Sequence, residues 1–221
     1  MLRVFITGYG IVSAFGKSWN EFRNALLKKQ NAVIYMQEWE KYKQLTTYLA
    51  APILDYKHPK EWSRKELRSL GRVSQYSVEA AGLALRMAGL FNDSSIKDGR
   101  MGVASGSSTG STDAILELAK LMFAGEGDCN ANSYIKSMPH TTAANIAIFY
   151  GLKGRMIPTS SACTSGSHAI GYAYEAIKYG RIQMMLAGGA EELCPSECYV
   201  FNSLYATSQK NSTPNLTPSP F

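Results

Sequence analysis

Apolar positions follow two alternating patterns along this chain. Short continuous apolar runs predict buried strands, and apolar residues spaced three and four apart predict helices with one buried face. Strands are expected at residues 3–12, 100–108, 154–163 and 182–193. Helices are expected at residues 18–30, 63–90, 111–127, 141–151 and 165–180. This alternation predicts an α/β fold with a largely parallel sheet.

Local signals mark several of these helix ends. Ser18 is an N-cap, Ser63 and Glu66 form a capping box, and Gly180 ends the last helix. The strand at residues 182–193 is strongly apolar, so we expect burial on both of its faces. Residues 31–62 are aromatic and irregular, and no element is assigned to them.

The last helix and the C-terminal segment differ in composition from the rest of the chain. Residues 165–180 are rich in alanine, glycine and serine and carry little charge, so burial on most sides of this helix is expected. From Thr207 the sequence becomes polar and proline-rich, which is typical of a linker or loop. We expect one domain at residues 1–206 and a linker at residues 207–221.

Composition and charge limit the class of protein. The 221 residues are 45% hydrophobic, and no stretch is apolar enough to span a membrane. No signal peptide is expected, and four cysteines without paired spacing indicate a reducing compartment, so we expect a cytoplasmic protein. The net charge of +6 includes a mild basic cluster at residues 57–72 without flanking aromatic runs. We expect no nucleic-acid partner, and a basic face for an acidic protein fits at least as well.

Cys163 lies where the expected strand at residues 154–163 meets the helix that follows. Free N–H groups at a helix N-terminus lower the pKa of a thiol, and the thiolate is the reactive form. The same N–H groups can hold the oxyanion that forms when a thiolate attacks a carbonyl. The neighbouring residues are small enough for a substrate to approach: Ser160, Ser161, Ala162, Ser165 and Gly166. The alternative is a buried structural cysteine, the usual fate of a free cysteine.

Five segments carry a resemblance to a known family. They are VFITGYGIVSAFG, GVASGSSTGS, MPHTTAANIAIFYGLKG, SSACTSGSHAIGYAYEAIKYG with MMLAGGAEEL, and YATSQKN with the terminal PSPF. They resemble segments of the β-ketoacyl-acyl carrier protein synthases. In the order given, the corresponding parts of that family are the opening strand and turn, the glycine-rich loop, the segment before the nucleophile strand, the active-site region and the link between the two halves. These are the condensing enzymes of fatty-acid and polyketide synthesis. The resemblance is weakest over residues 31–62.

The resemblance implies a fold, a reaction and partners. The implied thiolase fold stacks two βαβαβαββ halves around a buried nucleophile helix, and this chain would be the N-terminal half with a mixed, mostly parallel five-stranded sheet. Cys163 would take an acyl group from acyl carrier protein as a thioester, and the carbanion from decarboxylated malonyl-acyl carrier protein would attack it. Ser107 would lie near the gate of the acyl pocket and Phe201 near its floor. A homodimer or a heterodimer with a ketosynthase-like subunit is implied, and no cofactor.

The family places two further histidines and a lysine of its catalytic machinery in its second half, and this chain ends where that half would begin. His168 lies five residues after Cys163, on a different helix face, and we expect it, His140 and His58 to be structural or exposed. We therefore expect a gene fragment, a truncated product or one part of a split enzyme that cannot condense alone. A non-catalytic fragment, or a dimer partner of a ketosynthase, is the main alternative.

Two other sites are weaker alternatives. Residues 106–110 match the G-x-S-x-G pattern of serine hydrolases, with Ser108 as nucleophile and Asp128 and His140 following in the order of that fold. The spacing between Asp128 and His140 is cramped for a hydrolase. Cys194 and Cys198 are four residues apart, but no second pair completes a zinc site, so no metal is expected.

Overall fold

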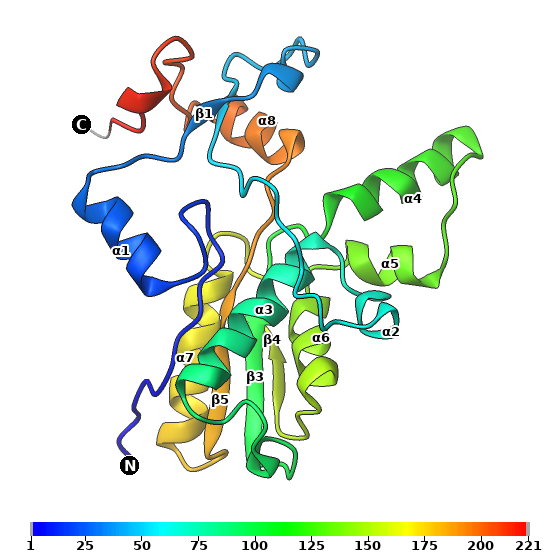
Figure 1. Cartoon of the computed structure of the whole chain (residues 1–221). Helices are drawn as coiled ribbons and strands as arrows, with labels where there is room; N and C mark the ends of the chain where they lie inside the picture. Colours follow the sequence, from blue (N-terminus) through cyan, green and yellow to red (C-terminus); the bar gives the residue numbers. More distant parts are fainter. Residues whose placement is uncertain (1, 220–221) are drawn as a thin grey trace. The chain divides into compact units, whose positions relative to one another are not determined.

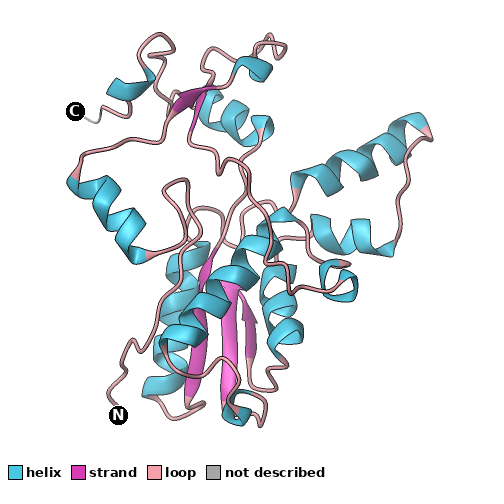
Figure 2. Ribbon diagram, in the orientation of Figure 1, coloured by secondary structure: helices cyan, strands magenta, loops and turns pink. Residues whose placement is uncertain are grey.

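The computed structural model describes residues 2–219 and divides the chain into two compact units. The first, here the sheet unit, comprises Met1–Gly10 and His58–Glu192. The second, here the ribbon unit, comprises Ile11–Lys57 and Leu193–Phe221. Figure 2 shows the strands of both units in magenta.

The sheet unit contains three parallel strands in the order β4-β3-β5. Their bounds are Met101–Gly106 for β3, Met156–Pro158 for β4 and Met184–Gly189 for β5. The central strand β3 is buried along its whole length. It pairs in parallel with both neighbours, through Val103 opposite Met156 and Met101 opposite Met184.

Helices cover both faces of this sheet (Figure 1). The helices of this unit are α2 (Arg64–Leu67), α3 (Arg72–Met87), α4 (Thr112–Ala124), α5 (Ala131–Ser137), α6 (Thr141–Tyr150) and α7 (Ser165–Lys178), with a short 3-10 helix at Ser94–Ile96. α3, α6 and α7 contact the strands, whereas α4 and α5 pack on each other. The chain crosses from β3 to β4 on one side and from β4 to β5 on the other. Because both crossovers are right-handed, α6 and α7 pack on opposite faces. α3 packs on α6, and α7 packs on β3 and β5.

The core of the sheet unit lies between β3 and the α3–α6 layer. Its most buried side chains are Val78, Leu85, Ile96, Val103 and Ala143. The Tyr150 hydroxyl also lies in this layer and donates a 2.7 Å hydrogen bond to the carbonyl of Val78. Burial raises the pKa of Tyr150, so this hydroxyl remains a hydrogen-bond donor at neutral pH.

The ribbon unit is built around a short antiparallel pair of strands. Its elements are α1 (Trp19–Leu27), β1 (Ile34–Tyr35), η1 (Gln37–Trp39), β2 (Leu49–Ala50), α8 (Pro195–Ser203) and η3 (Pro214–Leu216). Trp39, Leu45 and Cys198 form its small core. Asn202 ties α8 to the chain before β2, because its side-chain oxygen accepts from the backbone N–H of Thr46 at 2.7 Å. The expected domain boundary at Thr207 stays a prediction.

Much of the expected element pattern is confirmed. The α/β class, the parallel strands that contain residues 101–106, 156–158 and 184–189, and the helices from Thr112, Thr141 and Ser165 are all present. Both predicted caps also form, since Ser18 with Glu21 and Ser63 with Glu66 make complete capping boxes. These elements depend on local signals, which a sequence carries directly.

The predicted strand at residues 3–12 and the five-stranded sheet are wrong. Residues 2–12 form no strand, and the described residues contain a three-stranded sheet and a separate two-stranded one. The chain instead runs closely along α3: a Cβ on Gly8 would lie 2.3 Å from the carbonyl oxygen of Ala84, and one on Gly10 1.9 Å from that of Ala80. The glycines therefore serve this close approach to a helix.

Three further expectations change in detail. The helix predicted at residues 63–90 breaks into α2 and α3, because Gly71 is extended and a Cβ there would lie 2.2 Å from Ser111 Oγ. α7 is buried on one face only, and Ile170 and Tyr172 on its other face are exposed. β5 is only partly buried, because it lies at the edge of the sheet with one neighbouring strand.

Candidate active site

The carboxyl ends of the three parallel strands meet in the sheet unit at one edge of the sheet, the edge at which α/β proteins bind ligands. At this edge, two glycines allow neighbouring backbone segments to approach each other closely. A Cβ on Gly106 would lie 2.7 Å from the carbonyl carbon of Thr159, and one on Gly189 would lie 3.1 Å from the Cα of Gly166. The first turn of α7 therefore lies directly against the end of β5.

Cys163 lies at this edge, in the turn between β4 and α7. The residue before it, Ala162, adopts a left-handed backbone conformation with φ +53°, which is unfavourable for an L-residue other than glycine. The buried Ser165 fixes the turn, since its hydroxyl donates to the Ala162 carbonyl at 2.7 Å and accepts from the Ser161 N–H at 2.9 Å. Thr159 adds a 3.0 Å bond from its hydroxyl to the Ser165 carbonyl. The nucleophile candidate is thus held on a tightly bonded turn.

The start of α7 has no side-chain cap. Thr164 is the N-cap residue, but its hydroxyl donates to the carbonyl of Ser161 at 2.7 Å rather than accepting from a helix N–H. The N-terminal amides of a helix carry a partial positive charge that favours an anion. Cys163 therefore lies in the turn immediately before the uncapped N-terminus of a 14-residue helix.

The exposure of the four cysteines separates Cys163 from the others. Cys163 is exposed, Cys129 is half-buried, and both Cys194 and Cys198 are buried. Burial raises the pKa of the Cys198 thiol, which favours its protonated, unreactive form. The alternative of a buried structural cysteine is therefore wrong for Cys163 and fits Cys194 and Cys198.

Ser107 lies at the same sheet edge, just after β3, and is only 1% exposed. Its hydroxyl donates to the carboxylate of Glu191 at 2.6 Å, and the same carboxylate accepts from the Ser108 N–H at 2.6 Å. Ser107 Oγ in turn accepts from the Gly110 N–H at 3.1 Å. Sequence reasoning missed Glu191, which holds this loop from a position 84 residues further along the chain.

Phe201, the other predicted residue of the acyl pocket, lies on α8 of the ribbon unit and is 43% exposed. The structure therefore brings Cys163 and Ser107 to one sheet edge and carries Phe201 in the other unit. Its position at the floor of a pocket stays a prediction.

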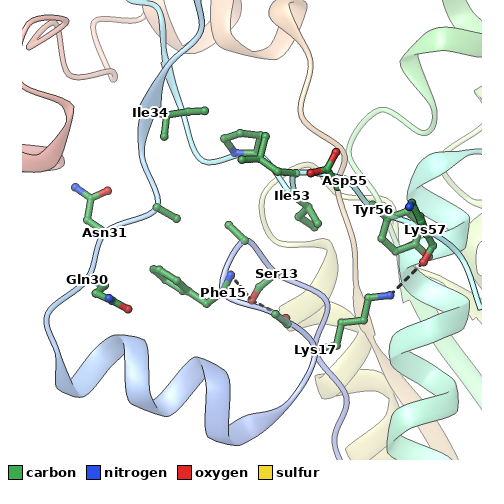
Figure 3. A pocket seen from close by; sticks show the side chains of 15 residues that line it. Ser13, Phe15, Lys17, Gln30, Asn31, Ile34, Ile53, Asp55, Tyr56 and Lys57 are labelled. Carbon is green, nitrogen blue, oxygen red and sulfur yellow. Dashed lines mark hydrogen bonds between the residues drawn. The ribbon is translucent and has the colours of Figure 1, made fainter.

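A cavity of about 710 Å³ lies within the ribbon unit (Figure 3). Phe15, Ile34 and Ile53 give it apolar walls, and Asn31 and Asp55 add polar groups. Lys17, also in its wall, donates to the carbonyl of Lys57 at 3.3 Å. None of the predicted site residues lines this cavity, so it carries no argument about the chemistry of Cys163.

The alternative sites gain no support from the geometry. Among residues 2–219, no hydrogen bond joins the side chains of Ser108, Asp128 and His140, although a hydrolase triad would require two such bonds. No group of three or more His, Cys, Asp or Glu side chains in the described part of the chain could hold a metal ion. No helix within that part is both long and apolar enough to cross a membrane.

His168 makes a contact that the sequence did not indicate. Its Nδ1 lies 2.8 Å from Ser161 Oγ, across the turn that carries Cys163. The sequence spacing predicts that His168 lies on a different helix face from the Cys163 thiol. In the structure its side chain contacts Ser161, at the start of the turn, rather than Cys163. No motif could have identified this pair, because it depends on the backbone path between Ser161 and α7.

Comparison with known proteins gives one consistent result. Residues 1–218 match the model of the Beta-ketoacyl synthase N-terminal domain. The chain is 30% identical over 222 residues to the 3-oxoacyl-[acyl-carrier-protein] synthase 2 of Vibrio harveyi, covering 99% of this chain and 53% of that protein. The chain thus spans about half the length of the curated relatives it matches.

Two solved structures extend the comparison. A beta-ketoacyl synthase from Burkholderia phymatum is 53% identical, with a TM-score of 0.96 that covers 100% of this chain and 54% of that one. A ketosynthase solved in complex with its type II PKS acyl-carrier protein is 26% identical, with a TM-score of 0.78 that covers 94% of this chain and 50% of that one. The fold is therefore the thiolase-like fold of these ketosynthases, in its N-terminal half.

Proposed function

The chain belongs to the beta-ketoacyl synthase family through its N-terminal domain, and from this we propose that it carries the acyl-accepting half of a ketosynthase. In this role the Cys163 thiolate accepts an acyl group from an acyl carrier protein. The observation that carries the proposal is an exposed thiol on a tightly bonded turn at the uncapped N-terminus of α7.

The acyl transfer follows from the chemistry of a thiolate. The Cys163 sulfur attacks the thioester carbonyl of the acyl-carrier protein and forms a tetrahedral intermediate, whose oxyanion is stabilised by nearby backbone N–H groups. The intermediate collapses with cleavage of the bond to the carrier sulfur, which leaves as a thiolate and takes up a proton. The products are an acyl thioester on Cys163 and a free carrier thiol, so no cofactor is needed.

The second step of the proposed reaction is the decarboxylative condensation with malonyl-acyl carrier protein. By family resemblance this step uses two histidines and a lysine of the second half. None of His58, His140 and His168 is proposed for it, because the family motif does not place a catalytic histidine at these positions. We propose that the residues of this chain suffice for acyl transfer and not for condensation.

Acyl transfer is tested directly by mass spectrometry. The 221-residue chain is incubated with an acyl carrier protein that carries a saturated acyl group, and the intact mass and the acylated peptide are determined. We expect one acyl group per chain, on the peptide that contains Cys163. A chain that remains unmodified, or one that carries the acyl group on Cys129 to the same extent, would contradict the proposal.

A basic surface on the sheet unit supports an acidic carrier protein as the partner. Arg64 and Lys65 on α2 and Arg68 just after it are all exposed. Clustered positive side chains steer and hold a partner of opposite charge, and the effect weakens as salt screens it. We propose that this basic surface, Arg64, Lys65 and Arg68, docks the carrier protein.

Charge reversal on the basic surface is expected to weaken carrier binding. The double variant Arg64→Glu with Arg68→Glu should raise the Kd for acyl carrier protein about tenfold at low salt, because attraction becomes repulsion. Fluorescence anisotropy at two salt concentrations measures the effect, which should shrink at the higher one. The matched control is Lys153→Glu with Arg155→Glu, which changes the charge by the same amount. Both residues are exposed and lie just before the N-terminal end of β4, whereas Cys163 follows its C-terminal end. Equal losses in both double variants would remove the proposed docking site.

A ketosynthase-like subunit is the second proposed partner. α4 exposes Leu116, Met122 and Phe123, and α5 exposes Tyr134. Apolar surface of this extent favours burial in a protein interface. A homodimer or a heterodimer with a related subunit would bury it.

A further inference from the structure

We propose that His168 is a positioning residue for Cys163 and acts through the hydroxyl of Ser161. The inference rests on the proposed function in taking Cys163 as the acyl acceptor. Its observations are the contact of Nδ1 with Ser161 Oγ at 2.8 Å and the bonds that this hydroxyl makes within the turn.

Ser161 and His168 join the two ends of the segment that carries the thiol. Ser161 precedes Cys163 by two residues, and His168 follows it on the second turn of α7. The imidazole is also in edge contact with Tyr172, with ring centroids 6.2 Å apart and planes at 69°. The imidazole therefore contacts both Tyr172 and Ser161.

The Ser161 hydroxyl is the centre of a small hydrogen-bond network. The Thr164 hydroxyl lies 2.7 Å from the Ser161 carbonyl and 3.1 Å from Ser161 Oγ. Ser161 Oγ lies 3.2 Å from the Thr159 carbonyl and closer, at 2.8 Å, to His168 Nδ1. With a neutral imidazole protonated on Nε2, the Ser161 O–H donates to Nδ1, while the Thr164 O–H donates to the Ser161 carbonyl. Residues on both sides of Cys163 are therefore tied to one histidine.

This network has a physical task, because the turn is unfavourable on its own. Ala162, between Ser161 and Cys163, has φ +53°, which an alanine adopts only when its surroundings hold it there. Ser165 holds this turn from the helix side through the Ala162 carbonyl. The Ser161–His168 bond holds the turn from the strand side. Loss of this bond should make the turn more mobile, so that Cys163 spends a smaller fraction of time beside the helix N-terminus.

A role for His168 as the base that deprotonates Cys163 fits the geometry less well. Nδ1 is engaged with Ser161. To act through Ser161, His168 needs only a hydrogen-bonding atom at the position of Nδ1. To act as the general base for Cys163, it would need to take up a proton. This difference makes the two roles separable by substitution, since asparagine reproduces the Nδ1 position without titrating.

The test is the rate of Cys163 alkylation by iodoacetamide on the full 221-residue chain, with Cys129 in the same sample as the internal reference. His168→Ala should slow Cys163 about fivefold relative to Cys129, the effect of one lost hydrogen bond, and Ser161→Ala should slow it at least as much, because this hydroxyl also contacts Thr159 and Thr164. The double variant should be no slower than Ser161→Ala, because that variant already removes the bond to His168. His168→Asn should restore the rate to within about twofold of the original, since its amide can meet Ser161 Oγ.

The controls separate this inference from folding and from the proposed function. His140→Ala changes an exposed histidine of the same unit that makes no side-chain cap bond, and it should leave the rate unchanged. Unchanged rates in Ser161→Ala and His168→Ala, additive losses in the double variant, or a His168→Asn variant as slow as His168→Ala would each overturn the inference. Failure of acyl transfer to the unsubstituted chain would overturn the proposed function instead, and the relative alkylation rates would still decide the role of His168.

Discussion

Cys163→Ala is expected to abolish thioester formation on this chain, with a loss of at least about a thousandfold in the rate of acyl transfer. The reason is that no other thiol combines exposure with a helix N-terminus. Cys194 and Cys198 are buried, and Cys129 is half-buried in the loop between α4 and α5. The measurement is the intact mass of the chain after incubation with acyl carrier protein that carries an acyl group.

Two further variants make this result specific. Cys163→Ser keeps the size and polarity of the side chain but replaces a thiol with a hydroxyl, which is far less ionised at neutral pH, so it should be nearly as inactive as the alanine variant. Cys129→Ala should retain full acylation. Because Cys163 is exposed, both of its substitutions should leave the unfolding midpoint unchanged. Acylation of Cys163→Ala at the original rate would assign the chemistry to another residue.

The position of Cys163 could be predicted because the signals around it are local. A short apolar strand, a run of small residues and an alanine-rich helix follow one another within about two dozen positions of the sequence. The secondary structure of each segment is indicated by its own residues, through their secondary-structure propensities and the spacing of the apolar positions. The strand–turn–helix arrangement, and with it the place of Cys163 just before the helix N-terminus, therefore follows from the sequence. The exposure of its thiol does not, because a buried cysteine fitted the same pattern.

The supporting contacts could not be predicted, because they join distant parts of the chain. Glu191 reaches Ser107 across 84 positions, and no spacing rule connects the two. The strand expected at residues 3–12 failed for a related reason: its apolar pattern fits a strand, but its glycines lie against α3. A pattern identifies a buried segment, whereas its partner in space decides whether the segment becomes a strand.

Glu192 is the clearest of these missed contacts, and it joins two helices. One carboxylate oxygen accepts from both the N–H and the hydroxyl of Thr112 at 2.6 Å, and the other accepts from the N–H of Val73 at 3.2 Å. Thr112 begins α4 and Val73 lies in the first turn of α3, and the N-cap residues of these helices, Ser111 and Gly71, make no side-chain cap bond. A single buried carboxylate thus caps two helix N-termini, where a negative charge is favoured.

Glu192→Ala is expected to lower the free energy of unfolding of the chain by about 3 kcal/mol, because three charge-assisted bonds are lost at a side chain that is only 6% exposed. Glu192→Gln should cost about half as much, since its amide oxygen still accepts from Thr112 while its NH₂ group faces the N–H of Val73. Urea unfolding followed by circular dichroism measures both. Glu117→Ala, which removes an exposed carboxylate paired with Lys120 on α4, is the control and should change the stability by less than about 0.5 kcal/mol. A loss for Glu192→Ala as small as that of this control would contradict the prediction. The cap of α3 would then come from Ser111, whose hydroxyl lies 3.3 Å from the same Val73 nitrogen.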